Sequence, residues 1–414
     1  MKRTLVLLPW LVSACGGEVG VVTDGGHDDF DGAEFDVSVP LPESGADMGA
    51  GDASSDASVP DGRPTPNSQC ASTQGVHATP GPNQGAVGCS SPDGGALQIL
   101  KGYTWRSQQI AMDGANLYWV EQDGVVKADK TGVPVTKFCI SAGSVDVMIE
   151  DASVLYVGTS NGSSHAILKI PTQGGNWTQV AAPTTWPVGL AADDTNIYWL
   201  EQDSQPVPNV TPPADGVRIG RVAKDGTGEG VLVTGKAIYG MASDGTDLYW
   251  LTLNASGNGG FGVFGMPLVG GPQRLVAQPP DNPVPTGFAM DGTSLYWTGM
   301  ATVAAVARVV KDGSGLTQLA TTNQSIAAGL EVEGSRAYWG ECANGTYGNL
   351  VIHRMNTDGT APVVLLTKQT AYDPPPKPTG AYTECVLDFA SDATSLYFTT
   401  DIITSPGLLY RICK

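Results

Sequence analysis

The chain has 414 residues, of which 41 are acidic and 22 basic, so its formal net charge is −19. This acidity argues against nucleic acid as a partner, because proteins that bind it carry basic patches, and against electrostatic attachment to anionic membrane surfaces. Beyond a short apolar run at the N-terminus, no segment has the roughly 18 apolar residues that a membrane-spanning helix needs.

Residues 1–14 have the three parts of an export signal. Lys2 and Arg3 precede an apolar run from Leu5 to Val12, and small residues follow it. Cys15, directly after Val-Ser-Ala, resembles the lipobox of bacterial lipoproteins, which implies cleavage before Cys15 and acylation of its thiol. The alternative is a plain signal peptide with an incidental cysteine. We expect a lipid-anchored protein of the bacterial cell envelope, in the outer membrane and outside the cytoplasm.

Residues 15–90 are predicted to be an acidic, disordered tether. Between residues 16 and 69 there are 12 acidic residues and one basic residue, and Asp, Gly, Ala, Ser and Pro dominate. Such a segment buries too little apolar surface to offset the entropy of ordering. An EF-hand loop around Gly32 is the alternative, but it would place His27 and Ser38 at its first and last ligand positions.

Residues 91–414 repeat one phrase seven times: an acidic residue, five steps, then a tyrosine usually followed by an aromatic residue. The pairs are Asp113–Tyr118, Asp151–Tyr156, Asp193–Tyr198, Asp244–Tyr249, Asp291–Tyr296, Glu333–Tyr338 and Asp392–Tyr397. The tyrosines are 38, 42, 51, 47, 42 and 59 residues apart. A period of about 45 residues in strand-forming sequence is typical of a β-propeller. We therefore predict an all-β, seven-bladed propeller of four-stranded antiparallel blades.

Each blade is expected to bury both faces of its second strand, with the tyrosine packing one way and the following aromatic residue the other. The last repeat stops before its fourth strand. The missing turn and strand stand instead before the first repeat, at 91–101. We predict that residues 96–101 complete the last blade beside residues 407–412, which removes two open sheet edges.

The phrase Ser294-Leu-Tyr296-Trp297-Thr298, followed by Asp312-Gly313, resembles the YWTD repeat of lipoprotein-receptor propellers and related propellers of bacterial lipoproteins. Those receptor propellers have six blades, whereas this chain has seven repeats. In that family the acid three residues after the tyrosine has a mainly structural role, linking neighbouring blades. Glu121, Glu201 and Glu341 occupy this position here, and the resemblance implies a structural role for them beside a candidate binding role.

Antiparallel order places the connections of each blade on two opposite faces. The first-to-second and third-to-fourth turns are short and share what we call the short-turn face; the other connections vary in length and share the long-loop face. Because function concentrates in loops on a rigid scaffold, we predict binding at the long-loop face. Its candidate aromatic residues are Trp105, Trp186, Tyr372 and Tyr382, for each of which local loop packing is the alternative.

These features predict a monomeric, non-catalytic binding or scaffold module for a protein or glycan ligand of the cell envelope, without a cofactor or metal. The four histidines form no metal or hydrolase motif. The alternative is a hydrolase or lyase that uses carboxylates, with or without calcium, at the central channel. The acids of the short turns fit turn capping better than metal binding.

Six cysteines remain if Cys15 is acylated: Cys70, Cys89, Cys139, Cys342, Cys385 and Cys413. Cys342 lies just after a second strand and Cys385 opens the next blade's first strand, so we pair them on the long-loop face. Cys413 ends a third strand on the short-turn face and is paired with Cys89, which would staple the closure of the ring. Cys139 is then left to Cys70; alternatively Cys70 pairs locally with Cys89.

Overall fold

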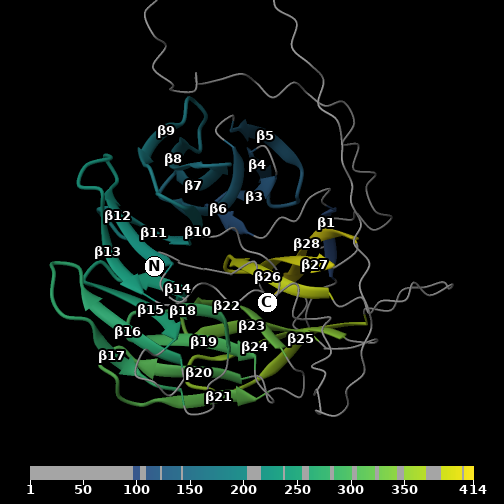
Figure 1. The fold of residues 1–414 in the computed structure, drawn as a ribbon. Coiled ribbons are helices and arrows are strands. Elements are labelled where there is room, and N and C mark those ends of the chain that lie inside the picture. The colour runs from purple at the N-terminus through teal and green to yellow at the C-terminus, as the bar shows by residue number, and fades with distance from the viewer. Residues whose placement is uncertain are drawn as a thin grey trace, which may run out of the picture. The chain divides into compact units, whose positions relative to one another are not determined.

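The computed structural model describes residues 97–102, 109–121, 124–140, 143–202, 216–235, 238–253, 261–279, 284–300, 305–321, 326–342, 349–369, 384–402 and 405–414. These residues form a seven-bladed β-propeller of four-stranded antiparallel sheets, as predicted (Figure 1). Strands and turns make up the described ranges, and within them no helix has the length and apolarity to cross a membrane.

Six blades are built from four consecutive strands each. Blade 1 contains β2 (Ile110–Met112), β3 (Asn116–Glu121), β4 (Gly124–Asp129) and β5 (Pro134–Cys139), and blade 2 contains β6 (Ser144–Asp151), β7 (Val154–Asn161), β8 (Ser164–Pro171) and β9 (Thr178–Ala181). Blade 3 contains β10 (Trp186–Ala192), β11 (Asn196–Gln202), β12 (Val217–Ala223) and β13 (Gly230–Gly235), and blade 4 contains β14 (Ile238–Ser243), β15 (Asp247–Leu253), β16 (Phe261–Pro267) and β17 (Arg274–Ala277). Blade 5 contains β18 (Val284–Met290), β19 (Ser294–Met300), β20 (Ala305–Val310) and β21 (Thr317–Thr321), and blade 6 contains β22 (Ile326–Glu333), β23 (Arg336–Cys342), β24 (Asn349–Asn356) and β25 (Val363–Gln369).

Blade 7 combines the two ends of the propeller. It contains β26 (Glu384–Ser391), β27 (Ser395–Ile402), β28 (Ser405–Cys413) and, on its outer edge, β1 (Gln98–Gly102). β1 runs antiparallel to β28, with Gln98 opposite Arg411 and Gly102 opposite Leu408 (Figure 1). The predicted closure by an N-terminal strand is therefore confirmed. Because β1 and β28 are far apart in sequence, their pairing couples the first blade to the last.

The short turns have a local cause in the repeated Asp-Gly phrases. In blade 3 the backbone N–H of Thr227 donates to Asp225 Oδ1 at 2.9 Å, and Gly226 has φ of +89°. A residue with a Cβ is strained at that φ, so glycine is favoured there. The aspartate side chain and the glycine backbone together set the turn, which explains why the pair recurs.

The core lies between blades and is built from the aromatic pairs. Tyr198 packs in a cluster with residues of blade 4, such as Trp250, whereas its neighbour Trp199 packs in a cluster with residues of blade 2, such as Tyr156. Both faces of the second strand are therefore buried, as the sequence predicted. Each of these side chains can bury on the order of 150–250 Å².

The innermost strands carry a bulge that the sequence did not predict. The register against the second strand shifts by one residue in blades 2 to 7. The extra residues are Asp146, Val188, Tyr239, Thr286, Gly329 and Leu387. A bulge bends its strand and re-aims the side chain of the extra residue. Each shift lies near the long-loop end of its strand.

Candidate functional site

In five blades the acid that opens the repeat caps the turn between the first two strands; these acids are Asp113, Asp193, Asp244, Asp291 and Asp392. In blade 3, Asp193 Oδ1 accepts hydrogen bonds from the backbone N–H groups of Thr195 and Asn196, both at 2.7 Å. Asp193 Oδ2 accepts from the Tyr198 hydroxyl at 2.5 Å, which explains the five-residue spacing of the motif. The corresponding pairs Asp113–Tyr118 and Asp291–Tyr296 are each joined at 2.6 Å.

These hydrogen bonds set the protonation of the acids. Burial alone would raise the pKa of Asp193, but the hydrogen bonds from Tyr198 and the turn outweigh it and lower the pKa. Burial and the bond to Asp291 raise the pKa of Tyr296 to about 12. Each pair is therefore a carboxylate and a neutral phenol near neutral pH, and the acid acts as a structural cap.

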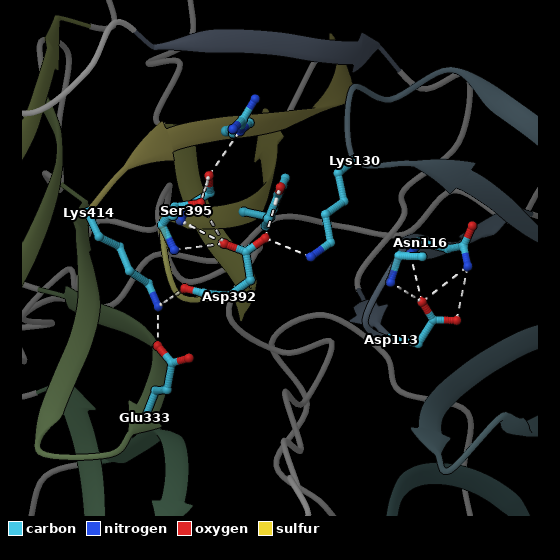
Figure 2. A network of polar contacts seen from close by, with 11 residues as sticks. Asp113, Asn116, Lys130, Glu333, Asp392, Ser395 and Lys414 are labelled. Carbon is cyan, nitrogen blue, oxygen red and sulfur yellow. Dashed lines mark hydrogen bonds and ion pairs between the residues drawn. The ribbon is translucent and has the colours of Figure 1, made fainter. Parts of the chain in front are cut away.

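Lysines join the turn acids of neighbouring blades at the short-turn face. Lys130 of blade 1 donates to Asp392 of blade 7 at 2.8 Å, and Lys311 of blade 5 donates to Asp244 of blade 4 at 2.9 Å. Lys414 of blade 7 contacts Glu333 of blade 6 and donates to the Asp392 carbonyl at 2.6 Å (Figure 2).

The lysines alternate around the ring. Lys130, Lys224, Lys311 and Lys414, of blades 1, 3, 5 and 7, contact the acids Asp392, Asp151, Asp244 and Glu333 of the preceding blades. Thr172, Leu268 and Thr357 stand at the same position in blades 2, 4 and 6, because each donates its backbone N–H to the first turn of its blade as Lys224 does. The blades before these, blades 1, 3 and 5, have Asp113, Asp193 and Asp291 as their turn acids. The Oδ2 atom of each accepts a tyrosine hydroxyl.

A cavity of about 750 Å³ lies in the channel toward the short-turn face. Residues of β2, β6, β18, β22 and β26 line it together with apolar side chains such as Met148 and Leu330. Its acidic lining residues are Asp113, Glu150, Asp151, Glu331, Glu333, Asp388 and Asp392, and Lys130 also lines it. The cavity thus lies toward the face opposite to the predicted binding face.

The deeper acids of this cavity bond to neighbouring blades. Asp388 Oδ2 accepts the backbone N–H of Ile110 at 3.0 Å, and Glu331 accepts the Ser391 hydroxyl at 3.0 Å. These bonds link blade 7 to blade 1 and blade 6 to blade 7. Within the described ranges, no three His, Cys, Asp or Glu side chains are grouped to hold a metal ion. The channel acids thus serve first as connections between blades.

Two of the predicted site residues, Glu121 and Glu341, lie apart on the long-loop face, in blades 1 and 6. Glu121 forms an ion pair with Lys137 at 2.9 Å, and Glu341 lies 2.9 Å from His353 Nε2, so both contact strands of their own blade. The expected links to neighbouring blades are not seen in these pairs, because the partners stand on the third and fourth strands of the same sheet. Trp105, Tyr372 and Tyr382 lie outside the described residues.

Trp186 and Glu201 do lie together, at the junction of blades 2 and 3. Glu201 is buried; its carboxylate forms an ion pair with Arg218 at 2.7 Å and accepts the backbone N–H of Thr184 at 2.9 Å. Trp186 is half-buried against the core, and its ring centroid lies 5.0 Å from that of His165 in blade 2. Two predicted residues therefore share one junction.

Sequence reasoning missed the blade 2 side of this junction. Ser160 is directly opposite His165 in the β7–β8 pair, and the Ser160 hydroxyl contacts Asp146, the extra residue of the β6 bulge. Ser144 also donates to Asp146 at 3.3 Å. Burial raises the pKa of Asp146 to about 7 and lowers the pKa of His165. Asp146 has no sequence signal of its own, because the bulge that places it arises from tertiary packing.

The three cysteines whose side chains are described, Cys139, Cys385 and Cys413, are each disulfide-bonded. The register places Cys413 opposite Ser395, at the short-turn face, and Cys139 opposite Gly124, at the long-loop face. Cys139 and Cys413 therefore stand at opposite ends of their blades, as the strand directions require. Cys70 and Cys89 and the side chain of Cys342 lie outside the described residues, so the pairing stays a prediction.

No protein-family model matches the chain, and no curated protein matches its sequence. An oligogalacturonate lyase from Vibrio parahaemolyticus is similar in structure, with 11% identity and a TM-score of 0.53 over 77% of this chain and 91% of the lyase. A chain of the nidogen/laminin complex has 18% identity and a TM-score of 0.43, covering 62% of this chain and 93% of its own. The computationally designed Ika8 protein has 11% identity and a TM-score of 0.46, covering 76% and 86%. At 11% identity the likeness to the lyase supports the fold and no particular activity.

Proposed function

We propose that this protein is a non-catalytic binding module that takes its ligand at the long-loop face. The proposal rests on one observation: the acids that line the channel cavity already accept hydrogen bonds from the protein itself. Asp113, Asp388 and Glu331 hold turns and neighbouring blades through hydrogen bonds. A general acid or base must exchange protons with substrate, and an acid that holds the ring together serves that purpose poorly. The rim at Trp186 instead offers an aromatic side chain beside polar groups.

The proposal includes the address of the protein. Acylation of Cys15 would anchor the mature chain to an envelope membrane, and the acidic tether would hold the propeller away from it. Cys15→Ser should release mature protein into the soluble fraction. Unchanged membrane association of the Cys15→Ser protein would refute the lipid anchor and leave the binding proposal standing.

The test of binding is affinity capture from the protein's own envelope, with immobilised residues 15–414 as bait. Trp186→Ala should abolish recovery of the ligand, and Glu150→Gln, at the channel cavity, should leave it unchanged. Loss of capture in Glu150→Gln alone would place binding in the channel and overturn the proposal. Thermal midpoints of both variants establish that they are folded.

A hydrolase or lyase at the channel is the second candidate, because the cavity of about 750 Å³ has carboxylates in its wall. The likeness to a lyase propeller concerns the fold alone. Calcium binding measured by calorimetry, together with chemical change of a captured ligand on incubation, would favour this candidate. Both should be lost in Glu150→Gln if the channel is the site.

A further inference from the structure

We propose that the junction of blades 2 and 3 on the long-loop face is a binding site for a neutral oligosaccharide, held by Trp186, His165, Ser160 and Asp146. This names the ligand class of the face proposed above and rests on that proposal. Three features of the junction carry it: a fixed aromatic ring, an unpaired polar atom beside it, and compensated charge.

The indole of Trp186 is fixed in place at the surface. It packs against the buried core of blades 3 and 4, and its ring centroid lies 5.0 Å from that of His165, with the two rings inclined at 57°. The blades approach closely here, because a Cβ at Gly158 would lie 2.9 Å from Pro187 Cβ. A half-buried indole loses little entropy on binding, and its flat apolar face complements the C–H face of a sugar ring.

His165 offers the unpaired atom. Its Nδ1 is buried and has no hydrogen-bond partner among the described residues. A buried polar atom without a partner costs free energy, and a ligand hydroxyl that bonds to it recovers that cost. Neutral imidazole has one donor and one acceptor nitrogen, and the Ser160 hydroxyl opposite His165, which donates its proton to Asp146, can still accept a hydrogen bond. Sugar hydroxyls, which both donate and accept, match these groups.

The charges at the junction are compensated. The Glu201 carboxylate is paired with Arg218 at 2.7 Å, and its charge still acts on His165. Asp146 is held by two serine hydroxyls and is partly protonated at neutral pH, since burial raises its pKa to about 7. A strongly cationic ligand would find little net negative charge here, and an anionic glycan would meet the repulsion of a chain with net charge −19. A neutral, hydroxyl-rich ligand therefore fits best.

The test uses residues 15–414 with maltohexaose, cellohexaose, chitohexaose, a hexameric oligouronate and oligolysine as probes, measured by calorimetry and tryptophan fluorescence. At least one neutral hexasaccharide should bind. Trp186→Ala should weaken that binding at least tenfold and His165→Ala severalfold, and Trp186→Phe should retain most of it. The matched control Trp177→Ala, before β9 on the short-turn side, should leave affinity unchanged.

The outcomes separate this inference from the function on which it rests. If no neutral saccharide binds but envelope capture still depends on Trp186, the ligand class is wrong and the binding face stands. Preference for the oligouronate or for oligolysine would overturn the charge argument. If capture and saccharide binding are both indifferent to Trp186→Ala, the proposed face is wrong as well. The thermal unfolding midpoint of each variant shows whether it is folded, so that a loss of binding caused by unfolding is recognised.

Discussion

Replacing Asp193 with alanine should destabilise the propeller far more than replacing an exposed turn acid. Asp193 is 5% exposed and accepts two backbone N–H groups, the Thr195 hydroxyl and the Tyr198 hydroxyl. Hydrogen bonds to a charged acceptor contribute about 1.5–3 kcal/mol, and a buried hydroxyl left without a partner costs about 1–3 kcal/mol. The turn amides can recover water, but the buried Tyr198 hydroxyl has less access to it.

We therefore expect Asp193→Ala to lower the free energy of unfolding by about 3–4 kcal/mol. The measurement is the urea midpoint with its slope, together with the thermal midpoint. Asp225→Ala is the matched control. Asp225 also caps a turn through the N–H and hydroxyl of a threonine two residues later, but it is exposed. The control should shift the midpoints much less.

A double-mutant cycle isolates the bond between acid and phenol. Tyr198→Phe removes the hydroxyl, so in that background Asp193→Ala leaves no buried donor unpaired. The two losses should therefore be less than additive by about 1–2 kcal/mol. Additive losses, or an Asp193→Ala loss no larger than that of Asp225→Ala, would refute the account of the repeat as an acid–tyrosine hydrogen bond.

The pH dependence has a defined sign. The folded state lowers the pKa of Asp193, so the carboxylate contributes stability above its unfolded value near 3.8. That contribution is lost as pH falls through the folded value. Asp193→Asn should therefore reduce the loss of stability on acidification, and an unchanged acid limb would contradict the assignment.

Three further predictions concern the ring, the junction and the disulfides. Lys311→Met should lower the free energy of unfolding by about 0.5–1 kcal/mol at low salt, because it removes a partly exposed ion pair with Asp244. The difference should shrink near 1 M salt, which screens exposed charges. A loss of stability that does not depend on salt would indicate a packing effect instead. The contribution of Asp146 to stability should fall as pH rises from about 4 to 7, because burial raises the pKa of Asp146 to about 7. Asp146→Asn should flatten that decline, and an unchanged profile would contradict it. Peptide mapping without reduction should recover Cys342–Cys385 and Cys89–Cys413; a Cys139–Cys413 peptide would contradict the strand directions, and Cys70–Cys89 would remove the closure staple alone.

The architecture could be predicted because its causes are local and repeated. The Asp193–Tyr198 spacing, the Asp225-Gly226 turn and the paired aromatic residues each act within one hairpin; the spacing occurs in all seven repeats and the other two features in several of them. The closing strand followed from counting, since the last repeat lacks a strand and residues before the first repeat supply one. Such features need no knowledge of how the blades meet.

The candidate site could not be predicted in the same way, because it depends on contacts between blades. Asp146 is placed by a bulge that no residue of β6 announces, and His165 meets Trp186 across the gap between two sheets. Trp186 was found only as an aromatic residue near a variable loop. The repeated Lys-Asp-Gly phrases do contain lysines that bridge neighbouring blades. Their acidic partners lie far away in the sequence, however: Lys224 and Asp151 are 73 residues apart.

The alternation of lysines has a consequence at the closure of the ring. In a ring of seven blades a two-blade alternation cannot close without placing two bridged blades side by side, and these are blades 7 and 1. Lys130 of blade 1 binds the Asp392 side chain, and Lys414 of blade 7 donates to the Asp392 carbonyl and contacts Glu333 of blade 6 (Figure 2). Asp392 caps the first turn of blade 7, the sheet that β1 completes. Because blades 7 and 1 both carry a bridging lysine, two lysine bridges, those of Lys414 and Lys130, lie where the two ends of the propeller meet. Because opening at blade 7 would break both the β1–β28 pairing and these bridges, the closure is reinforced where a ring made from one chain is otherwise weakest.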